Sequence, residues 1–232
     1  SAALEVAALR ALRALLSIDL DDVELAKLAR RAEVEYAGAR SGMLDQMVAS
    51  IGQPSRMLLI DARTMEHELL PWPDADLIVL DSNVARTSTT SGQDERRSEC
   101  ERAARLLGIT ALRDESTLER IEQLPEPLAR RARHVITENA RALEAAHGVD
   151  ATRLGELMNQ SHASLRDDYD ASVAPLDEMV RLLQEHPKVY GARLTGFGGA
   201  CAALVHRGTA SQVKAAVLKD YRAAGLAGKE LV

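Results

Sequence analysis

The sequence predicts an α+β protein with two lobes. Two helical segments open the chain, three short apolar segments between residues 57 and 80 are typical of strands, and a long helical block follows a polar break. A glycine-rich turn, a strand and a further helix come last. Because strands and helices fall into separate runs instead of alternating, α+β is favoured over a parallel α/β sheet. The polar break at residues 81–91 is the expected boundary between the lobes.

Length, composition and net charge narrow the class of protein. A chain of 232 residues, 46% hydrophobic and 28% charged, is typical of a soluble protein of one or two domains. The net charge is −6 and no basic run appears, so we expect no nucleic-acid binding. No uncharged apolar run reaches about 18 residues, so we expect no membrane span. Cys100 and Cys201 form no metal-type cluster and indicate a reducing, cytoplasmic location. Composition predicts no oligomeric state.

The first two helices are predicted from apolar spacing. Few charges interrupt residues 2–16, so we expect this helix to be mostly buried through a face made of Leu4, Ala8, Leu12, Leu15 and Leu16. Asp21 and Glu24 have the spacing of a capping box for the next helix. That helix places Leu25, Leu28, Ala29, Ala32 and Tyr36 on one side. Glu33 borders this side, either as half-covered structure or as a ligand that points into a cleft.

A loop punctuated by Gly38 and Gly42 leads to a short helix that Asp45 opens and Gly52 closes. A carboxylate at a helix start interacts favourably with the free N–H groups and the helix dipole. Asp45 is therefore either an ordinary N-cap or a base or anchor that faces a hydroxyl substrate.

Short apolar runs at residues 57–61, 66–70 and 76–80 predict strands, and we expect the third to be buried on both faces. The hydroxyl-rich residues 87–92, before a helix at 94–107, suit either an anion site or a solvated loop.

The helical block is expected to continue as residues 117–123, 127–147, 151–165 and 173–185. We interpret Arg130, Arg131, Arg133 and His134 as a solvated charged face, and His162 as a structural histidine. After the glycine-rich turn at 195–199 come a strand and a helix at 210–223.

Four stretches carry a resemblance to a known family. They are SAALEVA at 1–7, AEVEYAGARSGMLDQMVASIGQPSRMLLID at 32–61, SNV…ERRSECERAARLLG at 82–108 and SHASLRDDYDAS…LDEMV…VYGARLTG at 161–196. Together they resemble the galactokinase family of the galactokinase, homoserine kinase, mevalonate kinase and phosphomevalonate kinase (GHMP) superfamily. The GMLDQ and SLRDDY pieces are quite specific to sugar kinases of this kind.

The resemblance implies a two-lobed GHMP kinase fold. Residues 1–82 would form an incomplete N-terminal, ATP-binding domain. Residues 83–232 would form the C-terminal domain, largely helical with a small antiparallel sheet. The family transfers the γ-phosphate of ATP to the anomeric hydroxyl of galactose. A small-molecule sugar, ATP and Mg²⁺ are therefore the implied ligands.

Site residues follow by position from the resemblance. Asp45 matches the carboxylate that contacts the sugar O1 and is assigned as base, and Gly42 matches a backbone contact to the sugar. Glu33 matches the acidic Mg²⁺ ligand. Ser1 matches the last serine of the phosphate loop, which contacts phosphate and Mg²⁺. Such an arrangement fits phosphoryl transfer, in which positioning and charge neutralisation do most of the catalysis.

Two departures from the family pattern bear on activity. The family's N-terminal signature region is not matched, so we expect this chain to be weakly active or inactive by itself. Gln93 stands where the family has a tyrosine near the sugar. Gln93 keeps open a kinase for another sugar, such as galacturonate, arabinose or N-acetylgalactosamine. The unmatched N-terminal region keeps open a non-catalytic galactokinase-like sensor or scaffold that binds a partner.

Overall fold

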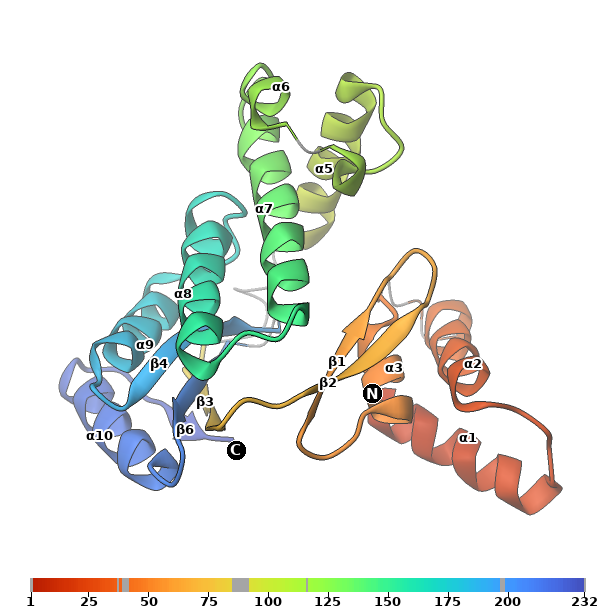
Figure 1. Cartoon of the computed structure of the whole chain (residues 1–232), viewed down its shortest axis with the longest axis horizontal. Helices are drawn as coiled ribbons and strands as arrows, with labels where there is room; N and C mark the ends of the chain where they lie inside the picture. Colours follow the sequence, from red (N-terminus) through yellow and green to blue (C-terminus); the bar gives the residue numbers. More distant parts are fainter. Residues whose placement is uncertain are drawn as a thin grey trace. The chain divides into compact units, whose positions relative to one another are not determined.

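A computed structural model describes residues 2–36, 38, 42–84, 92–115, 117–196 and 199–231. The chain forms two compact units, Ser1–Trp72 and Pro73–Val232, and each is described here by itself (Figure 1). Both helices and antiparallel strands occur in each unit, which confirms the predicted α+β class.

The first unit combines three helices with one hairpin. Its elements are α1 (Ala2–Leu16), α2 (Asp22–Tyr36), α3 (Leu44–Ile51), β1 (Arg56–Ile60) and β2 (His67–Pro71). Asp21 caps α2 as predicted, because its carboxylate accepts from the backbone N–H groups of Val23 and Glu24 at 2.9 and 2.8 Å. Strands β1 and β2 pair antiparallel, with Leu58 opposite Leu69.

The predicted buried face of α1 is wrong. Leu4 and Leu15 are 71% and 78% exposed, whereas Val6 is buried and packs with Leu25 and Ala29 of α2. Ala, Leu or Val side chains occupy almost every side of α1, so apolar spacing alone does not identify the face that packs against α2. For α2 the same analysis correctly places Leu25 and Ala29 in the core but wrongly includes Tyr36, which is exposed.

The second unit contains one four-stranded antiparallel sheet, in the order β4-β5-β3-β6, and a larger set of helices. The strands are β3 (Ala75–Asp81), β4 (Val189–Thr195), β5 (Ala200–His206) and β6 (Lys229–Glu230). The helices are α5 (Gln93–Leu107), the 3-10 helix η1 (Leu112–Asp114), α6 (Leu118–Glu122), α7 (Leu128–Ala146), α8 (Ala151–Asp167), α9 (Ala174–Glu185) and α10 (Ala210–Ala223). A largely helical lobe with a small antiparallel sheet is thereby confirmed.

Residues of the sheet and of helices α9 and α10 share the main core. Ile78 and Leu80 of β3 pack with Met179 of α9 and Tyr221 of α10. The prediction that β3 is buried on both faces is wrong, because Leu77, on the opposite face, is 41% exposed. Buried and more exposed side chains alternate along β3, as they do in an antiparallel sheet that packs only one face against the core.

The two units divide between Trp72 and Pro73, whereas the resemblance placed the end of the N-terminal domain at residue 82. The difference has a clear origin, since β3 pairs with β5 along its whole length, from Ala75 opposite His206 to Asp81 opposite Ala200. Strand β3 therefore belongs to the sheet of the second unit.

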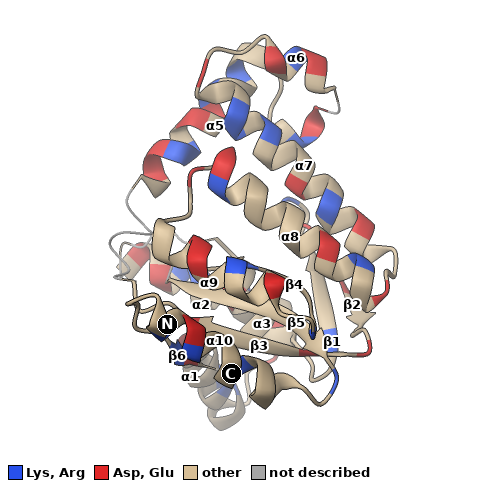
Figure 2. Cartoon of the chain, turned by 90° about the vertical axis from the view of Figure 1, so that its left-hand side faces the viewer, with Lys and Arg blue, Asp and Glu red and all other residues tan. Residues whose placement is uncertain are grey.

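Basic and acidic residues are interleaved in the sequences of α5 and α7, as the colours of the ribbon show (Figure 2). The interpretation of residues 130–134 as a solvated face is wrong for two of its members, because Arg131 is 5% and His134 is 6% exposed. Arg131 Nε donates to Glu99 of α5 at 2.7 Å, and its Nη1 donates to the carbonyl of Asp168 at 2.7 Å. These partners satisfy the buried cation, as burial of a charge requires.

Among the described residues, no helix is both long and apolar enough to cross a membrane. Cys100 and Cys201 are free thiols.

Candidate functional site

The carboxylate of Glu33 lies near the end of α2, half-buried against α3. Nε2 of Gln46 donates a hydrogen bond to its Oε2 at 2.8 Å. The same nitrogen lies 3.4 Å from Oε2 of Glu5, on α1. Three helices thus bring two carboxylates to the amide group of Gln46, a residue that is 1% exposed. Glu33 is therefore a held side chain rather than a freely moving one.

Asp45 directly precedes Gln46 on α3, yet the two side chains differ in environment. Consecutive helical residues point about 100° apart, so burial of Gln46 turns Asp45 outward. Asp45 is exposed, and within the described part of the chain its carboxylate has no hydrogen-bond partner. It is not the N-cap, which is Met43. Asp45 lies in the first helical turn, where the dipole and free N–H groups favour an anion.

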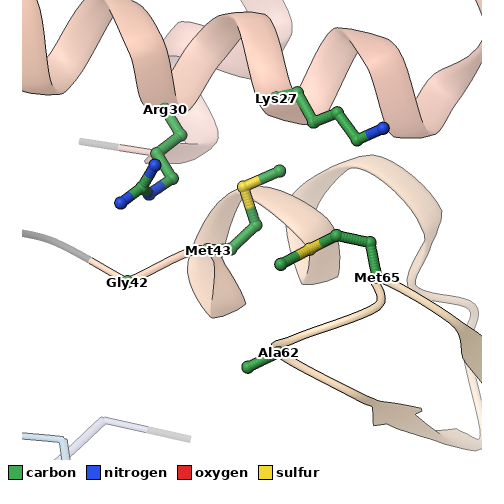
Figure 3. Close-up of a pocket in the computed structure, with 6 residues that line it drawn as sticks. All are labelled: Lys27, Arg30, Gly42, Met43, Ala62 and Met65. Atoms are coloured by element: carbon green, nitrogen blue, oxygen red, sulfur yellow. The ribbon is translucent and has the colours of Figure 1, made fainter. Parts of the chain in front are cut away.

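Gly42 lines a pocket of about 400 Å³ in the first unit, together with Met43 and residues of α2 and the β1–β2 connection (Figure 3). Lys27 and Arg30 of α2 contribute two cations to its wall, and Met65 lies opposite them. Neither Glu33 nor Asp45 is among the described lining residues. Of the predicted site residues, the pocket is lined by Gly42 and not by the two predicted acidic residues.

The two remaining predicted residues are Ser1 and Gln93. Ser1 falls outside the described residues, and α1 begins directly after it at Ala2. Gln93 is the exposed first residue of α5, in the second unit, and follows Gly92, whose φ of 77° is left-handed. Of the hydroxyl-rich segment at 87–92, residues 87–91 also lie outside the described part of the chain.

Arg96 fixes the start of α5. It is 6% exposed, its Nη1 donates to the carbonyl of Asp170 at 3.2 Å, and its guanidinium lies 5.6 Å from the ring centroid of Tyr169. Tyr169 in turn stacks on His134, with ring centroids 4.4 Å apart. The SLRDDY motif therefore acts here as a packing element that secures the helix beginning with Gln93.

His162 behaves as the structural histidine that we expected. It is 3% exposed; Nδ1 accepts from the backbone N–H of Leu194 at 3.4 Å, and Nε2 lies 3.4 Å from Asp177. Burial lowers its pKa, which favours the neutral ring in the folded protein.

The donor set around Gln46 suits a hard cation, because Mg²⁺ binds oxygen ligands and usually keeps part of its coordination for water and substrate phosphates. No cluster of three or more His, Cys, Asp or Glu side chains with metal-site geometry occurs among the described residues. Sequence reasoning missed Glu5 and Gln46, although both lie within stretches that carry the family resemblance.

Two family models match the chain. The model for the GHMP kinases N terminal domain matches residues 1–53, and the model for the GHMP kinases C terminal matches residues 141–223. Together they cover more than half of the chain.

Known relatives agree with these models. A galactokinase from Roseiflexus sp. (strain RS-1) is 41% identical over 95% of this chain and 60% of its own length. The crystal structure of Lactococcus lactis galactokinase complexed with galactose is 32% identical, with a TM-score of 0.89 over 100% of this chain and 64% of its own. The structure of L. major mevalonate kinase in complex with R-mevalonate shares the fold, with a TM-score of 0.60 over 94% of this chain at 22% identity.

The chain therefore spans less than two thirds of the length of the two galactokinases that it matches. Its fold, the two family models and the galactokinase relatives agree with the resemblance carried by the GMLDQ and SLRDDY stretches. The chain belongs to the GHMP kinase family and carries the sequence features of its galactokinases.

Proposed function

We propose that this chain is part of a galactokinase-type sugar 1-kinase, which transfers the γ-phosphate of ATP to the anomeric hydroxyl of galactose. One observation carries the proposal: Glu33 is hydrogen-bonded to Gln46, the residue directly after Asp45. The two acidic residues assigned to the metal and to the sugar hydroxyl are thereby linked through one short helix, α3.

Each residue has a role that its position supports. Asp45 is exposed in the first turn of α3, where it can orient the sugar's anomeric hydroxyl and accept its proton. Glu33, held by Gln46, is the protein carboxylate for Mg²⁺, which when bound neutralises charge on the phosphates of ATP. Gly42 offers its backbone to the sugar. Ser1, just before the N-terminus of α1, is assigned to the ATP phosphates.

The choice of sugar depends partly on Gln93. An amide at this position donates and accepts hydrogen bonds but lacks the aromatic face of the family's tyrosine. Galactose is the proposed substrate because the two relatives from Roseiflexus and Lactococcus lactis are both named galactokinases. Turnover of galacturonate, arabinose and N-acetylgalactosamine under the same conditions tests the alternatives, and a higher kcat/KM for one of them would replace galactose as the substrate.

Sugar 1-phosphate formation by the chain with MgATP tests the activity, and the galactose-dependent rise in melting temperature tests binding. Asp45→Asn should lower kcat by about 100-fold or more, as loss of a general base does. Asp19→Asn, at an exposed site between α1 and α2, is the matched control and should leave kcat unchanged. Because we expect the chain to be weakly active or inactive by itself, a low yield of product is compatible with the proposal. The absence of both product and a sugar-dependent rise in melting temperature, for every sugar of the panel, would contradict it.

A further inference from the structure

Helix α5 begins with Gln93, the residue that the resemblance assigns to the sugar, and an arginine one turn further along packs against this start. The N-cap is Gly92, which has no side chain that could cap the free N–H groups of the first turn. The guanidinium of Arg96 folds back toward Gly92, because a Cβ placed on Gly92 would lie 3.0 Å from its Nη1. The contacts of Arg96 therefore help to set where the first turn of α5 lies.

Arg96 is held by the turn that follows α8. It is 6% exposed, and its Nη1 donates to the carbonyl of Asp170 at 3.2 Å. Its guanidinium lies 5.6 Å from the ring centroid of Tyr169. A guanidinium and an aromatic ring at this distance attract each other, and more strongly where water is excluded. Two adjacent residues of one turn thus bind the same buried side chain.

Helix α7 holds this turn through three side chains. Arg131 Nη1 donates to the carbonyl of Asp168, the C-cap of α8, at 2.7 Å, and Arg133 Nη1 donates to its Oδ1 at 3.1 Å. A helix leaves its last carbonyls without partners of its own, and its dipole favours cations there. The ring of His134 stacks on Tyr169, with centroids 4.4 Å apart. The turn that binds Arg96 is therefore itself fixed to the helical core.

We infer that Arg96 and Tyr169 are positioning residues for sugar binding, because they fix the first turn of α5 and, through it, the amide of Gln93. The resemblance assigns no role to either residue. The inference rests on the proposed function, since the sugar role of Gln93 comes from the resemblance. An amide binds sugar hydroxyls only at hydrogen-bond distance and at a favourable angle. A helix start that is already fixed loses less conformational freedom on binding, so the sugar binds more tightly.

Galactose titrations followed by protein-observed nuclear magnetic resonance test this without turnover, because they give a dissociation constant for each variant. Gln93→Ala should weaken galactose binding by about five- to tenfold, as loss of one hydrogen bond does. Arg96→Met and Tyr169→Leu should each weaken it to a similar extent, because the first turn of α5 is then free to move. In both variants the backbone amides of that turn should also exchange with solvent faster than in the wild type.

The double variant Gln93→Ala/Arg96→Met separates positioning from a general effect on the fold. If Arg96 acts through Gln93, its loss adds nothing once Gln93 is gone, so the double variant should bind galactose no more weakly than Gln93→Ala. Tyr169→Phe keeps the ring and should retain wild-type affinity. Arg97→Met is the matched control, since Arg97 is the exposed neighbour of Arg96 and lies 3.5 Å from Glu101 of the same helix.

Melting curves show which variants are folded, and Arg96→Lys, which keeps the charge without the planar guanidinium, replaces Arg96→Met if that variant unfolds. Wild-type affinity in a folded Arg96 variant and in Tyr169→Leu, with loss in Gln93→Ala, would overturn the inference and leave the sugar role of Gln93 intact. Additive losses in the double variant, or an equal loss in Arg97→Met, would also overturn it.

Wild-type affinity in Gln93→Ala would overturn the sugar role of this residue together with the inference. A wild-type chain that binds no galactose overturns the inference as well. The sugar phosphorylation assay, with the full panel of sugars, then decides the proposed function separately.

Discussion

Gly155 of α8 and Gly191 of β4 meet backbone to backbone. A Cβ placed on Gly191 would lie 1.9 Å from the carbonyl oxygen of Gly155, and one placed on Gly155 would lie 2.4 Å from the carbonyl carbon of Tyr190. The strand has a register shift between Val189 and Gly191, and Asn159 of α8 accepts from the backbone N–H of Ala192 at 2.9 Å. The absence of both side chains therefore sets how closely helix and sheet approach.

Gly191→Ala should destabilise the second unit by about 3 kcal/mol, the upper range for overpacking, because the clashing atoms are backbone and cannot rotate away. Urea unfolding followed by circular dichroism measures the change. Gly148→Ala is an informative comparison: Gly148 has a φ of 86° but open space around its Cα, so alanine there incurs only the left-handed backbone penalty of about 1–2 kcal/mol. Equal losses in the two variants would contradict the contact.

Substitution of Arg131 should destabilise the protein much more than substitution of its neighbour Arg130. Arg131→Met removes the partner of the largely covered Glu99, whose side chain is 12% exposed, and should cost about 3–5 kcal/mol of unfolding free energy. Arg130→Met removes a half-exposed pair with Glu126 and should cost at most about 1 kcal/mol. Thermal and urea unfolding of both variants measure the two losses of unfolding free energy. Equal losses for Arg130→Met and Arg131→Met would show that the buried ion pair contributes no more to stability than the exposed one.

Most of the fold follows from local sequence. Apolar spacing and glycine or proline breaks predict helices α5 to α10 and strands β1, β2, β3 and β5 to within a few residues, because each of these elements agrees with its own periodicity. Strand β4, Val189–Thr195, was not predicted. The buried side of α1 was not predictable in this way. Nor was the burial of Arg131, since its partners Glu99 and Asp168 are more than 30 residues away in sequence and only the folded chain brings them together.

The candidate site was predicted only in part. Glu33 and Asp45 come from the family resemblance, and the structure places them on adjacent helices that Gln46 connects. Their convergence on one cavity stays a prediction, as does the role of Gln93. Gln46 escaped notice because a buried glutamine has no signature in periodicity or charge. What distinguishes it is the pair of carboxylates that it contacts, and these are 13 and 41 residues away along the chain.

His134 should make stability depend on pH. Burial lowers its pKa to about 4 from an ordinary value of 6.5, while nearby Glu138 and Asp168 act in the opposite direction. The unfolded chain therefore binds a proton between pH 6.5 and 4 that the folded chain does not, so the free energy of unfolding falls as pH decreases through this window. The loss from this group is on the order of 3 kcal/mol at pH 4.

His134→Gln should flatten this part of the profile, measured by urea unfolding from pH 4 to 7. Buried His162 contributes a loss in the same direction, so a residual slope is expected to remain. His147→Gln, at an exposed histidine at the end of α7, is the control and should reproduce the wild-type curve. An unchanged slope in His134→Gln would mean that the ring is not held neutral by burial.

The exposed leucines of α1 should make the chain associate. Leu4, Leu12, Leu15 and Leu16 are 71%, 48%, 78% and 62% exposed, and contiguous exposed apolar surface promotes association. Size-exclusion chromatography with light scattering should show a mass above that of the monomer, and this mass should grow with protein concentration.

Leu12→Glu combined with Leu15→Lys should shift the chain toward monomer while changing the free energy of unfolding by about 0.5 kcal/mol or less, because neither side chain packs in the core. Val6→Glu, at the buried position on the same helix, should instead unfold the first unit, so charge on α1 is tolerated only on its exposed side. A wild-type chain that stays monomeric at the highest concentration tested would contradict the prediction that the exposed leucines of α1 cause association.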